Sequence, residues 1–382
     1  MTAVLLVVAI VLVALNLRPA LTSIGPLLGT VSAALGISSV TASLVTTLPV
    51  LCLGAFGPVA PLLARRMGLP AAAVVGLVMI AIGVVLRGFL GAPGLFAGSL
   101  MAGAGIGITG VLLPGVVKQA FPERAGLLTG IYTMALCGGA AVAAGLTAPI
   151  AEASGSWTLA LGVWAVPAIV AALVWWPSAR HLDTRSGHRP AAGTRLLASP
   201  LAWSITLYMG LQSSLAYSVF GWLPSILQDR GVSVVTSGLV VSMSLLVQTA
   251  SALVVPMIAA RRRNQQVWVL VIMGATLAGI LGMMWGPIAT MWPWAVVLGI
   301  GQGGSFSLAL VMIVLRAGDA MTAARMSGMA QSVGYTLAAL GPLAIGMMHE
   351  ITGGWDSVGW LLTGIGLVAL VAGLYAARDR TL

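Results

Sequence analysis

Charged residues are scarce in this chain, and acidic residues most of all: Asp and Glu number 8 among 382 residues. None of the eight falls inside the apolar helices predicted below, so no membrane-embedded carboxylate is available to pair with a cation or to carry a proton. The three histidines lie in loops or at a helix end, and Cys52 and Cys137 fall inside predicted helices. Neither a metal site nor a disulfide is therefore expected. Without a phosphate-binding loop, a nucleophile with a base or paired acids, we expect no cofactor and no enzyme.

Apolar residues dominate what is present, because hydrophobic side chains make up 59% of the chain and the mean hydropathy is +1.06. Stretches of about 20 apolar residues recur along the whole length, and each is long enough to cross about 30 Å of hydrocarbon. The sequence predicts an all-α membrane protein embedded in the lipid bilayer, with twelve transmembrane helices. They are residues 3–28, 39–63, 70–91, 94–117, 125–150, 157–177, 200–227, 234–259, 266–286, 291–314, 325–348 and 357–377.

The positive charges are unevenly distributed between the loops. Of the 18 Lys and Arg residues, 15 lie in the loops or tail that follow an even-numbered predicted helix. The positive-inside rule then places both termini and the central loop in the cytoplasm. This asymmetry accounts for the net charge of +10, so we expect no nucleic-acid partner. The expected location is a bacterial inner membrane.

A polar segment, 178–199, separates an N-terminal half, 1–177, from a C-terminal half, 200–382, and reads as a cytoplasmic linker between six helices and six. The halves resemble each other at offsets of 195 to 198 residues: Pro26 matches Pro224, and Gly103–Gly107 matches Gly299–Gly303. Several matches in order indicate a duplication. Two parallel, pseudo-symmetric six-helix halves are typical of transporters that bind their substrate near the midplane.

Arg18 is the only formal charge in the first apolar stretch, Thr2 to Leu28, and lies about 4 Å from its middle if the stretch is one helix. A charge there costs about 3 to more than 10 kcal/mol, so such residues usually face an opposite charge or a watery cavity. Since no buried carboxylate exists, an external anion is the natural partner, and Thr22 on the same helical face would add a hydroxyl. The alternative is that Arg18 binds backbone carbonyls and ties the helix to its neighbours.

Other polar side chains occur at similar depth in helices that would border a central cavity. In this position they either contact a substrate or form hydrogen bonds between helices. Tyr335 has an aromatic face that suits a small, flat substrate. The candidates are Tyr132, Gln212, Tyr217, Gln248, Gln302, Gln331 and Tyr335.

Asn16-Leu17-Arg18-Pro19, followed by Gly25-Pro26, resembles the cyanate permease and 2-nitroimidazole transporter family, a branch of the major facilitator superfamily. The run Gly103 to Ile108 with Pro114, and Gln248 with Pro256, are similar to family positions. The resemblance implies the major facilitator fold. It also implies a secondary active or facilitative transporter of a small anion, such as cyanate or a small organic anion. An exporter of small drugs such as nitroimidazoles, in which Arg18 makes only a polar contact, is the alternative.

The loop between predicted helices 2 and 3 departs from the wider superfamily. Where an Asp usually follows a Gly by four residues, Gly57 is followed by Pro61. Arg65 and Arg66 are therefore the candidate gating residues, through charge contacts with helix ends. Because no titratable acid lies in the membrane, we expect any proton to travel with the substrate as its conjugate acid, or transport to be facilitated or by exchange. We expect a monomer.

Overall fold

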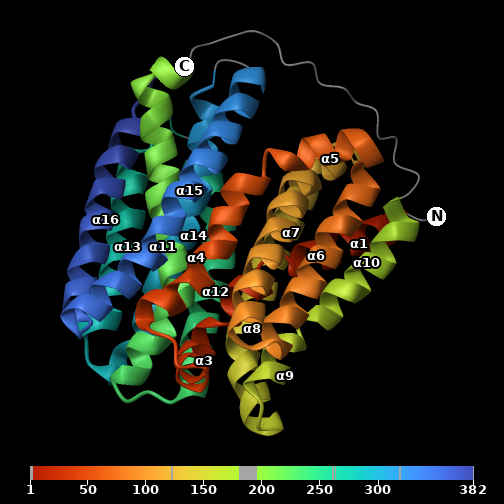
Figure 1. Ribbon diagram of the computed structural model, residues 1–382. Coiled ribbons are helices and arrows are strands. Elements are labelled where there is room, and N and C mark those ends of the chain that lie inside the picture. The colour runs from red at the N-terminus through yellow and green to blue at the C-terminus, as the bar shows by residue number, and fades with distance from the viewer. Residues whose placement is uncertain are drawn as a thin grey trace.

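The computed structural model describes residues 3–121, 124–179, 196–259, 262, 264–317 and 320–381, and these form helices and short connections without a strand (Figure 1). Ten helical segments of this described part are long and apolar enough to cross a membrane. The remaining two predicted spans lie in α11 (Pro200–Asp229) and α15 (Ala320–Thr352), of 30 and 33 residues. The fold prediction is confirmed, whereas most of the predicted linker, at 180–195, lies outside the described residues.

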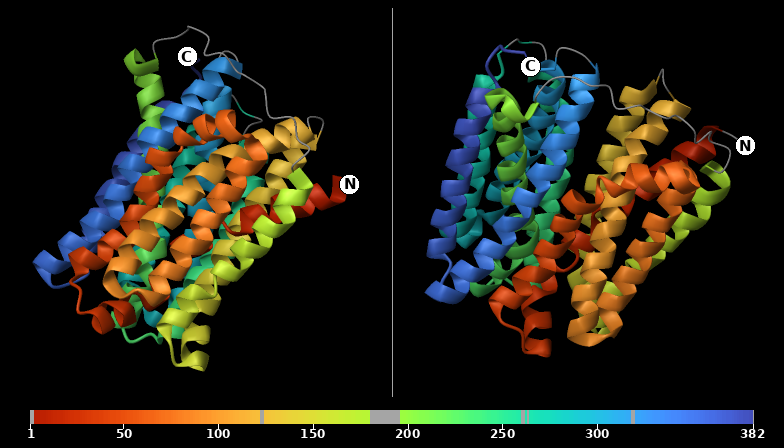
Figure 2. Two further views of the ribbon diagram at one scale, coloured as in Figure 1. Left: turned by 45° about the vertical axis from the view of Figure 1, so that its right-hand side comes forward. Right: turned by 45° about the horizontal axis from the view of Figure 1, so that its top comes forward.

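The helices form two groups that lie side by side (Figures 1 and 2). The amino-terminal group contains α1 (Ala3–Leu15), α2 (Pro19–Thr22), η1 (Gly25–Leu27), α3 (Leu28–Leu35), α4 (Ser39–Phe56), α5 (Val59–Met67), α6 (Leu69–Phe89), α7 (Gly91–Ala120), α8 (Ala125–Ser154), α9 (Trp157–Gly162) and α10 (Ala165–Ala179). The carboxyl-terminal group contains η3 (Leu196–Ala198), α11, α12 (Val234–Ala259), α13 (Gln266–Trp285), η4 (Ile288–Thr290), α14 (Met291–Leu315), α15 and α16 (Asp356–Ala376). We call the end where α10 finishes and α11 begins the linker end, and the opposite end, where α3 meets α4, the far end.

The first span is not the continuous helix that the sequence predicts. Pro19 has no N–H to donate to the Leu15 carbonyl, and a residue before proline avoids the helical conformation. Accordingly α1 stops at Leu15, and Arg18 has φ −124° and ψ −19°. Asn16 caps the broken end, since its side-chain amide donates to the carbonyls of Leu12 at 2.8 Å and Pro167 at 3.1 Å. Two short helical segments, α2 and η1, then lead into α3.

The second span is interrupted in a similar way. The predicted helix 39–63 divides into α4, which ends at Phe56, and α5, which begins at Val59. Gly57 and Pro58 separate the two helices, and the proline again removes a backbone donor. Arg65 and Arg66 fall in the last turn of α5 at the linker end, where their side chains are exposed.

The two groups of helices join at the far end. The side-chain amide of Gln228 donates to the Pro26 carbonyl at 3.0 Å. The Val40 N–H, at the start of α4, donates to a carboxylate oxygen of Glu350 at 2.9 Å. Gly25 lies so close to α11 that a Cβ there would be 2.2 Å from the Phe220 carbonyl oxygen. The far end of the bundle is therefore closed by backbone contacts as well as by side chains.

Glycines inside the spans serve helix packing. A Cβ on Gly103 of α7 would be 2.5 Å from the Pro49 Cα of α4. A Cβ on Gly303 of α14 would be 2.2 Å from the Gln248 carbonyl oxygen of α12. Such close backbone approach is the role of small residues in membrane helix interfaces.

A buried arginine ties together the linker end of the carboxyl-terminal group. Arg316, 2% exposed, donates to the carbonyls of Ala376 at 3.2 Å and Ala377 at 2.8 Å, and to the Gln265 side chain. Asp379 lies 4.0 Å away. Burial lowers the pKa of the Arg316 guanidinium, and the charge of Asp379 offsets part of that shift. The ends of α14 and α16 and the start of α13 are thereby joined.

Candidate binding site

Arg18 belongs to the amino-terminal group of helices, and its side chain reaches the carboxyl-terminal group. Because the break before Pro19 ends α1, the backbone at Arg18 leaves the helix axis, and the side chain remains partly exposed within the bundle. Its guanidinium carbon lies 5.8 Å from the ring centroids of both Phe220 on α11 and Phe306 on α14. These distances are within the range of cation–π contacts. No residue that the structure describes accepts a hydrogen bond from this guanidinium.

Two tyrosines extend the aromatic surface around Arg18. The Tyr217 ring lies edge-on to Phe220, with centroids 5.8 Å apart, and to Tyr335 of α15, with centroids 6.3 Å apart. Both tyrosines are within electrostatic range of Arg18. We call Arg18, Tyr217, Phe220, Phe306 and Tyr335 the arginine–aromatic cluster. It combines a cation from the amino-terminal group with rings from three helices of the carboxyl-terminal group.

Tyr132 lies on α8, where its side chain is half-buried. The structure brings together three residues that the sequence singles out: Arg18, Tyr217 and Tyr335. The phenylalanines were not predicted. A Phe in an apolar helix has no feature in the sequence that separates a cavity-lining ring from an ordinary core ring.

Thr22 and two of the glutamines form contacts elsewhere. Thr22 is 1% exposed, and its hydroxyl donates to the Ala140 carbonyl at 3.0 Å. Gln212 donates within α11, to the Met209 carbonyl at 3.1 Å. Gln331 donates to the Ser327 hydroxyl one turn nearer the linker end, at 2.7 Å. The Thr22 hydroxyl is also 3.3 Å from the backbone carbonyl of Arg18. Within the described part of the chain, none of the three side chains forms a hydrogen bond with the Arg18 guanidinium or with the tyrosine hydroxyls of the cluster.

Gln248 and Gln302 meet each other across α12 and α14. The Gln248 side-chain N–H donates to the Gln302 side-chain oxygen at 3.4 Å, and both residues are buried. The side-chain nitrogen of Gln302 has no partner among the described atoms. This pair forms a hydrogen bond between two helices of the carboxyl-terminal group, at the place where Gly303 lets their backbones approach.

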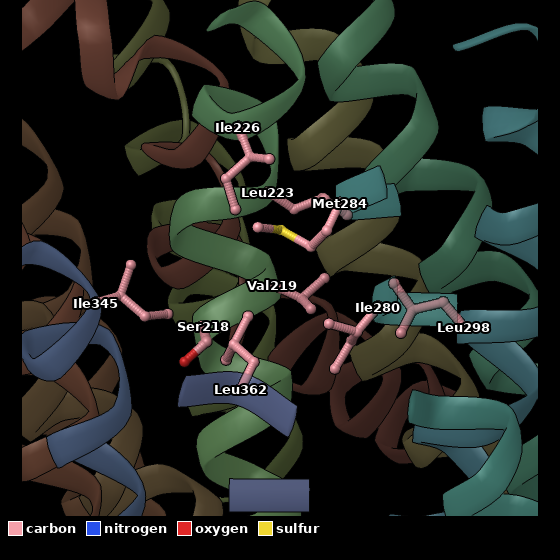
Figure 3. A pocket seen from close by; sticks show the side chains of 9 residues that line it. All are labelled: Ser218, Val219, Leu223, Ile226, Ile280, Met284, Leu298, Ile345 and Leu362. Carbon is pink, nitrogen blue, oxygen red and sulfur yellow. The ribbon is translucent and has the colours of Figure 1, made fainter. Parts of the chain in front are cut away.

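The carboxyl-terminal group also encloses a small cavity behind α11 (Figure 3). Its volume is about 10 Å³, close to the smallest that holds one water molecule. Apolar side chains such as Val219, Ile280 and Leu362 line it, and Ser218 is its only polar lining residue. No charged side chain lines this cavity, so it offers an anion no opposite charge, unlike the arginine–aromatic cluster.

The cluster has the chemistry of a site for a small, flat anion. Arg18 supplies a planar set of donors that matches two oxygens at once, and the aromatic rings supply flat apolar surfaces. The acids that the structure describes, such as Asp229 and Glu350, lie at helix ends. Among the described residues, no carboxylate forms an ion pair with Arg18.

Comparison with known proteins agrees with this architecture. Residues 4–338 match the Major Facilitator Superfamily. The chain is 38% identical to an uncharacterized transporter, YycB, of Bacillus subtilis, over 98% of this chain and 94% of that protein. It is 33% identical to the 2-nitroimidazole transporter of Escherichia coli, over 99% and 96% of the two chains. It is 31% identical to the cyanate transport protein CynX of the same organism, over 92% and 91%.

A solved structure shows the same fold. The crystal structure of a D-xylose–proton symporter superposes with a TM-score of 0.78 at 13% identity, and the match covers 99% of this chain and 98% of the symporter. The family match spans most of the sequence, and the cyanate and 2-nitroimidazole transporters align along nearly all of it. This multi-pass membrane protein is therefore a transporter, not an enzyme, and belongs to the Major Facilitator Superfamily beside those two relatives.

Proposed function

We propose that this transporter carries a small, flat anion, cyanate-like or a small organic anion, across the bacterial inner membrane by alternating access. One observation carries the proposal: the Arg18 guanidinium lies 5.8 Å from the ring centroids of both Phe220 and Phe306, with no hydrogen-bond acceptor among the described residues. A cation held in a bundle without an opposite charge is stabilised by an anion that enters from outside.

Tyr217, Tyr335 and Tyr132 complete the proposed site beside Arg18. Their rings contact the flat faces of the substrate, and their hydroxyls add polar contacts at its edge. The relatives named for cyanate and 2-nitroimidazole transport support this chemistry, because both ligands offer negative charge to a guanidinium: cyanate on its terminal oxygen and nitrogen, and a nitro group on its two oxygens. Thr22, Gln212, Gln248, Gln302 and Gln331 stay in the proposal as residues that shape the helices around the site.

The two halves, 1–177 and 200–382, rock against each other in this proposal, with both termini and the linker 178–199 in the cytoplasm. The excess of cations in the loops at the linker end supports that orientation. The contacts at the far end would then hold the periplasmic side closed in this structure. Arg65 and Arg66 are the proposed gating cations of the linker end, and the transporter works as a monomer.

A second candidate function is export of small neutral drugs such as nitroimidazoles. The ring arrangement around Arg18 favours it, because two phenylalanines and two tyrosines offer more apolar than polar surface. In that case Arg18 contacts the nitro group without neutralising a full charge. Because the predicted helices contain no acid that could carry a proton, we propose for either function that a transported proton is bound to the substrate. Otherwise transport is facilitated or occurs by exchange.

Uptake into proteoliposomes tests the proposal. Radiolabelled cyanate and a panel of small carboxylates are compared for the intact protein, Arg18→Gln, Arg18→Lys and, as a matched control, Arg380→Gln, whose guanidinium is exposed near the C-terminus. A hydrogen bond to a charged group contributes about 1.5 to 3 kcal/mol, so Arg18→Gln should weaken apparent affinity about 10- to 150-fold. Arg380→Gln should have no effect.

Two results would overturn the anion proposal. One is that the folded, intact protein takes up no anion of the panel. The other is saturable anion uptake that Arg18→Gln leaves unchanged. Transport of a 2-nitroimidazole that Arg18→Gln weakens only slightly, with no anion uptake, would establish the second function.

A further inference from the structure

A second arginine lies inside the amino-terminal group, and its charge is more deeply buried than that of Arg18. Arg87, near the far end of α6, is 2% exposed. One guanidinium nitrogen, Nη1, donates to the Ala20 carbonyl at 2.5 Å. The other two nitrogens, Nε and Nη2, are buried without a partner in the described part of the chain. The one contact that this guanidinium makes is with the interrupted first span, two residues after Arg18.

The Ala20 carbonyl needs a donor because the helix stops there. In a continuous helix it would accept from the Ile24 N–H. Here α2 ends at Thr22, the Ser23 N–H donates to the Pro19 carbonyl, and the Leu27 N–H donates to the Ile24 carbonyl. No backbone N–H of the described residues reaches Ala20. Arg87 satisfies a carbonyl that the break leaves open, as a buried backbone acceptor requires.

The backbone of α7 fixes where the Arg87 side chain runs. A Cβ on Gly98 would lie 2.8 Å from the Arg87 Cγ and 2.8 Å from the Arg87 backbone nitrogen. Any larger residue at this position would collide with the stem of the arginine. The guanidinium therefore reaches the first span from a rigid α6–α7 pair, and its position does not depend on a loop.

The carboxyl-terminal half lacks both features together. Its first helix, α11, runs unbroken from Pro200 to Asp229. At offsets of 195 to 198 residues, Arg18 corresponds to residues 213–216 and Arg87 to residues 282–285, and neither stretch contains a charge. The helix break with its arginine and the buried arginine that contacts the break occur in the same half only. If the fold required a cation in the third helix of each half, residues 282–285 of α13 would contain one, and they do not.

We propose that Arg87 is a positioning residue: by holding the Ala20 carbonyl it fixes the interrupted segment, Asn16 to Leu27, and with it the direction in which Arg18 points. The inference rests on the proposed function in one respect, because its effect on transport requires that Arg18 bind the substrate. Its structural part, an Arg87-dependent order of the segment, stands independently.

Cysteine labelling measures that order without any substrate. In a Cys52→Ala, Cys137→Ala background, Ser23→Cys places a thiol at a position that is 2% exposed and three residues from Ala20. N-ethylmaleimide labelling rates are compared for Arg87, Arg87→Lys, Arg87→Gln and Arg87→Met in detergent. We expect labelling about tenfold or more faster in Arg87→Met and Arg87→Gln, which lose a charged donor, and near the parent rate in Arg87→Lys.

Arg230→Met is the matched control. Arg230 also donates to backbone carbonyls at a helix end, those of Met283 and Gly286, but in the carboxyl-terminal half. Its loss should leave labelling at Ser23→Cys unchanged. If Arg87→Met does not give a monodisperse protein, Arg87→Gln is the test, since it keeps a polar side chain of shorter reach.

Transport kinetics complete the test. With an anion that the intact protein carries, Arg87→Gln should raise KM by about tenfold with a smaller change in kcat, because the binding group is misplaced while the halves still move. Unchanged labelling in folded Arg87→Met or Arg87→Gln would overturn the inference, as would faster labelling with unchanged KM while Arg18→Gln abolishes uptake. If Arg18→Gln is silent, the proposed function fails, and the labelling result still decides whether Arg87 orders the segment.

Discussion

Replacing Gly25 with alanine should open the far end of this transporter. Gly25 is in η1, and the Cβ of an alanine there would lie 2.2 Å from the Phe220 carbonyl oxygen and 3.3 Å from its carbonyl carbon. Both atoms are backbone, so no side-chain rotation relieves the contact. The distance is 0.8 Å short of 3.0 Å, below which real Cβ atoms are essentially never found. The first span and α11 must therefore move apart.

The size of the effect follows from the cost of overpacking. An extra methyl group in a well-packed interface costs about 1 to 3 kcal/mol. Only the state that is closed at the far end contains this contact, so the cost falls on that state alone. At 1.4 kcal/mol for each factor of ten, the closed population should fall about 5- to 150-fold relative to the open one.

A buried thiol at the interface reports the opening. Thr46 is 5% exposed and packs against Gly221 of α11, so Thr46→Cys in a protein without other cysteines should label slowly when the far end is closed. Adding Gly25→Ala should increase its maleimide labelling rate at least about fivefold. The control for unfolding is a separate protein in which native Cys52, 3% exposed inside the amino-terminal group, is the single cysteine; its labelling should stay slow with and without Gly25→Ala.

Gly354→Ala is the matched substitution, because a Cβ at Gly354 would meet nothing within 4 Å at the same end of the bundle. It should leave the Thr46→Cys rate unchanged. An unchanged rate in Gly25→Ala, with the protein folded, would refute the reasoning, since the contact would then not separate the two states. Equal acceleration at Cys52 would show general loosening in place of a rigid-body opening.

Two further changes act at opposite ends of the bundle. Glu350→Gln removes the charge that accepts from the Val40 N–H at the start of α4, which should weaken far-end closure by about 0.3 to 1 kcal/mol and raise Thr46→Cys labelling about two- to fivefold. Arg316→Met should destabilise the protein by about 2 to 4 kcal/mol in thermal unfolding, because it orphans buried carbonyls. Asp379→Asn should change Tm little, since that carboxylate is 56% exposed and 4.0 Å away.

Composition and repeat spacing were enough to predict the fold, because apolar length and loop charge are properties of whole segments. Interruptions inside the spans were harder to predict. Pro19 and Pro58 mark breaks, whereas Pro49, Pro114 and Pro224 lie within helices that continue past them. The presence of a proline therefore does not by itself predict whether a span breaks.

Some residues of the candidate site could likewise be predicted from the sequence, and others could not. Arg18 was predictable because a charge in an apolar stretch needs a reason that the sequence itself exposes. Tyr217 and Tyr335 share the cluster with it, whereas Gln212 and Gln331 turn back to their own helices. The depth of a polar residue in the membrane does not predict whether its side chain points toward the other half or toward its own helix. The burial of Arg87 was not predictable from the sequence, because it depends on the packing of α6 against α7 and on the contact of its guanidinium with the Ala20 carbonyl.

The cluster is built unequally from the two halves, and this matters for alternating access. The cation comes from the amino-terminal group, on a segment that Arg87 contacts, whereas the rings of Phe220, Phe306 and Tyr335 come from the carboxyl-terminal group. Under the proposed function the halves rock, and an anion bound to Arg18 would keep its ionic contact while the rings move over it. In the proposed cycle the charge contact is common to both states, and differences in affinity between the two sides of the membrane arise from the aromatic face. Substituting Tyr335 should therefore alter the balance between the two directions of transport more than substituting Arg18, which should weaken both equally.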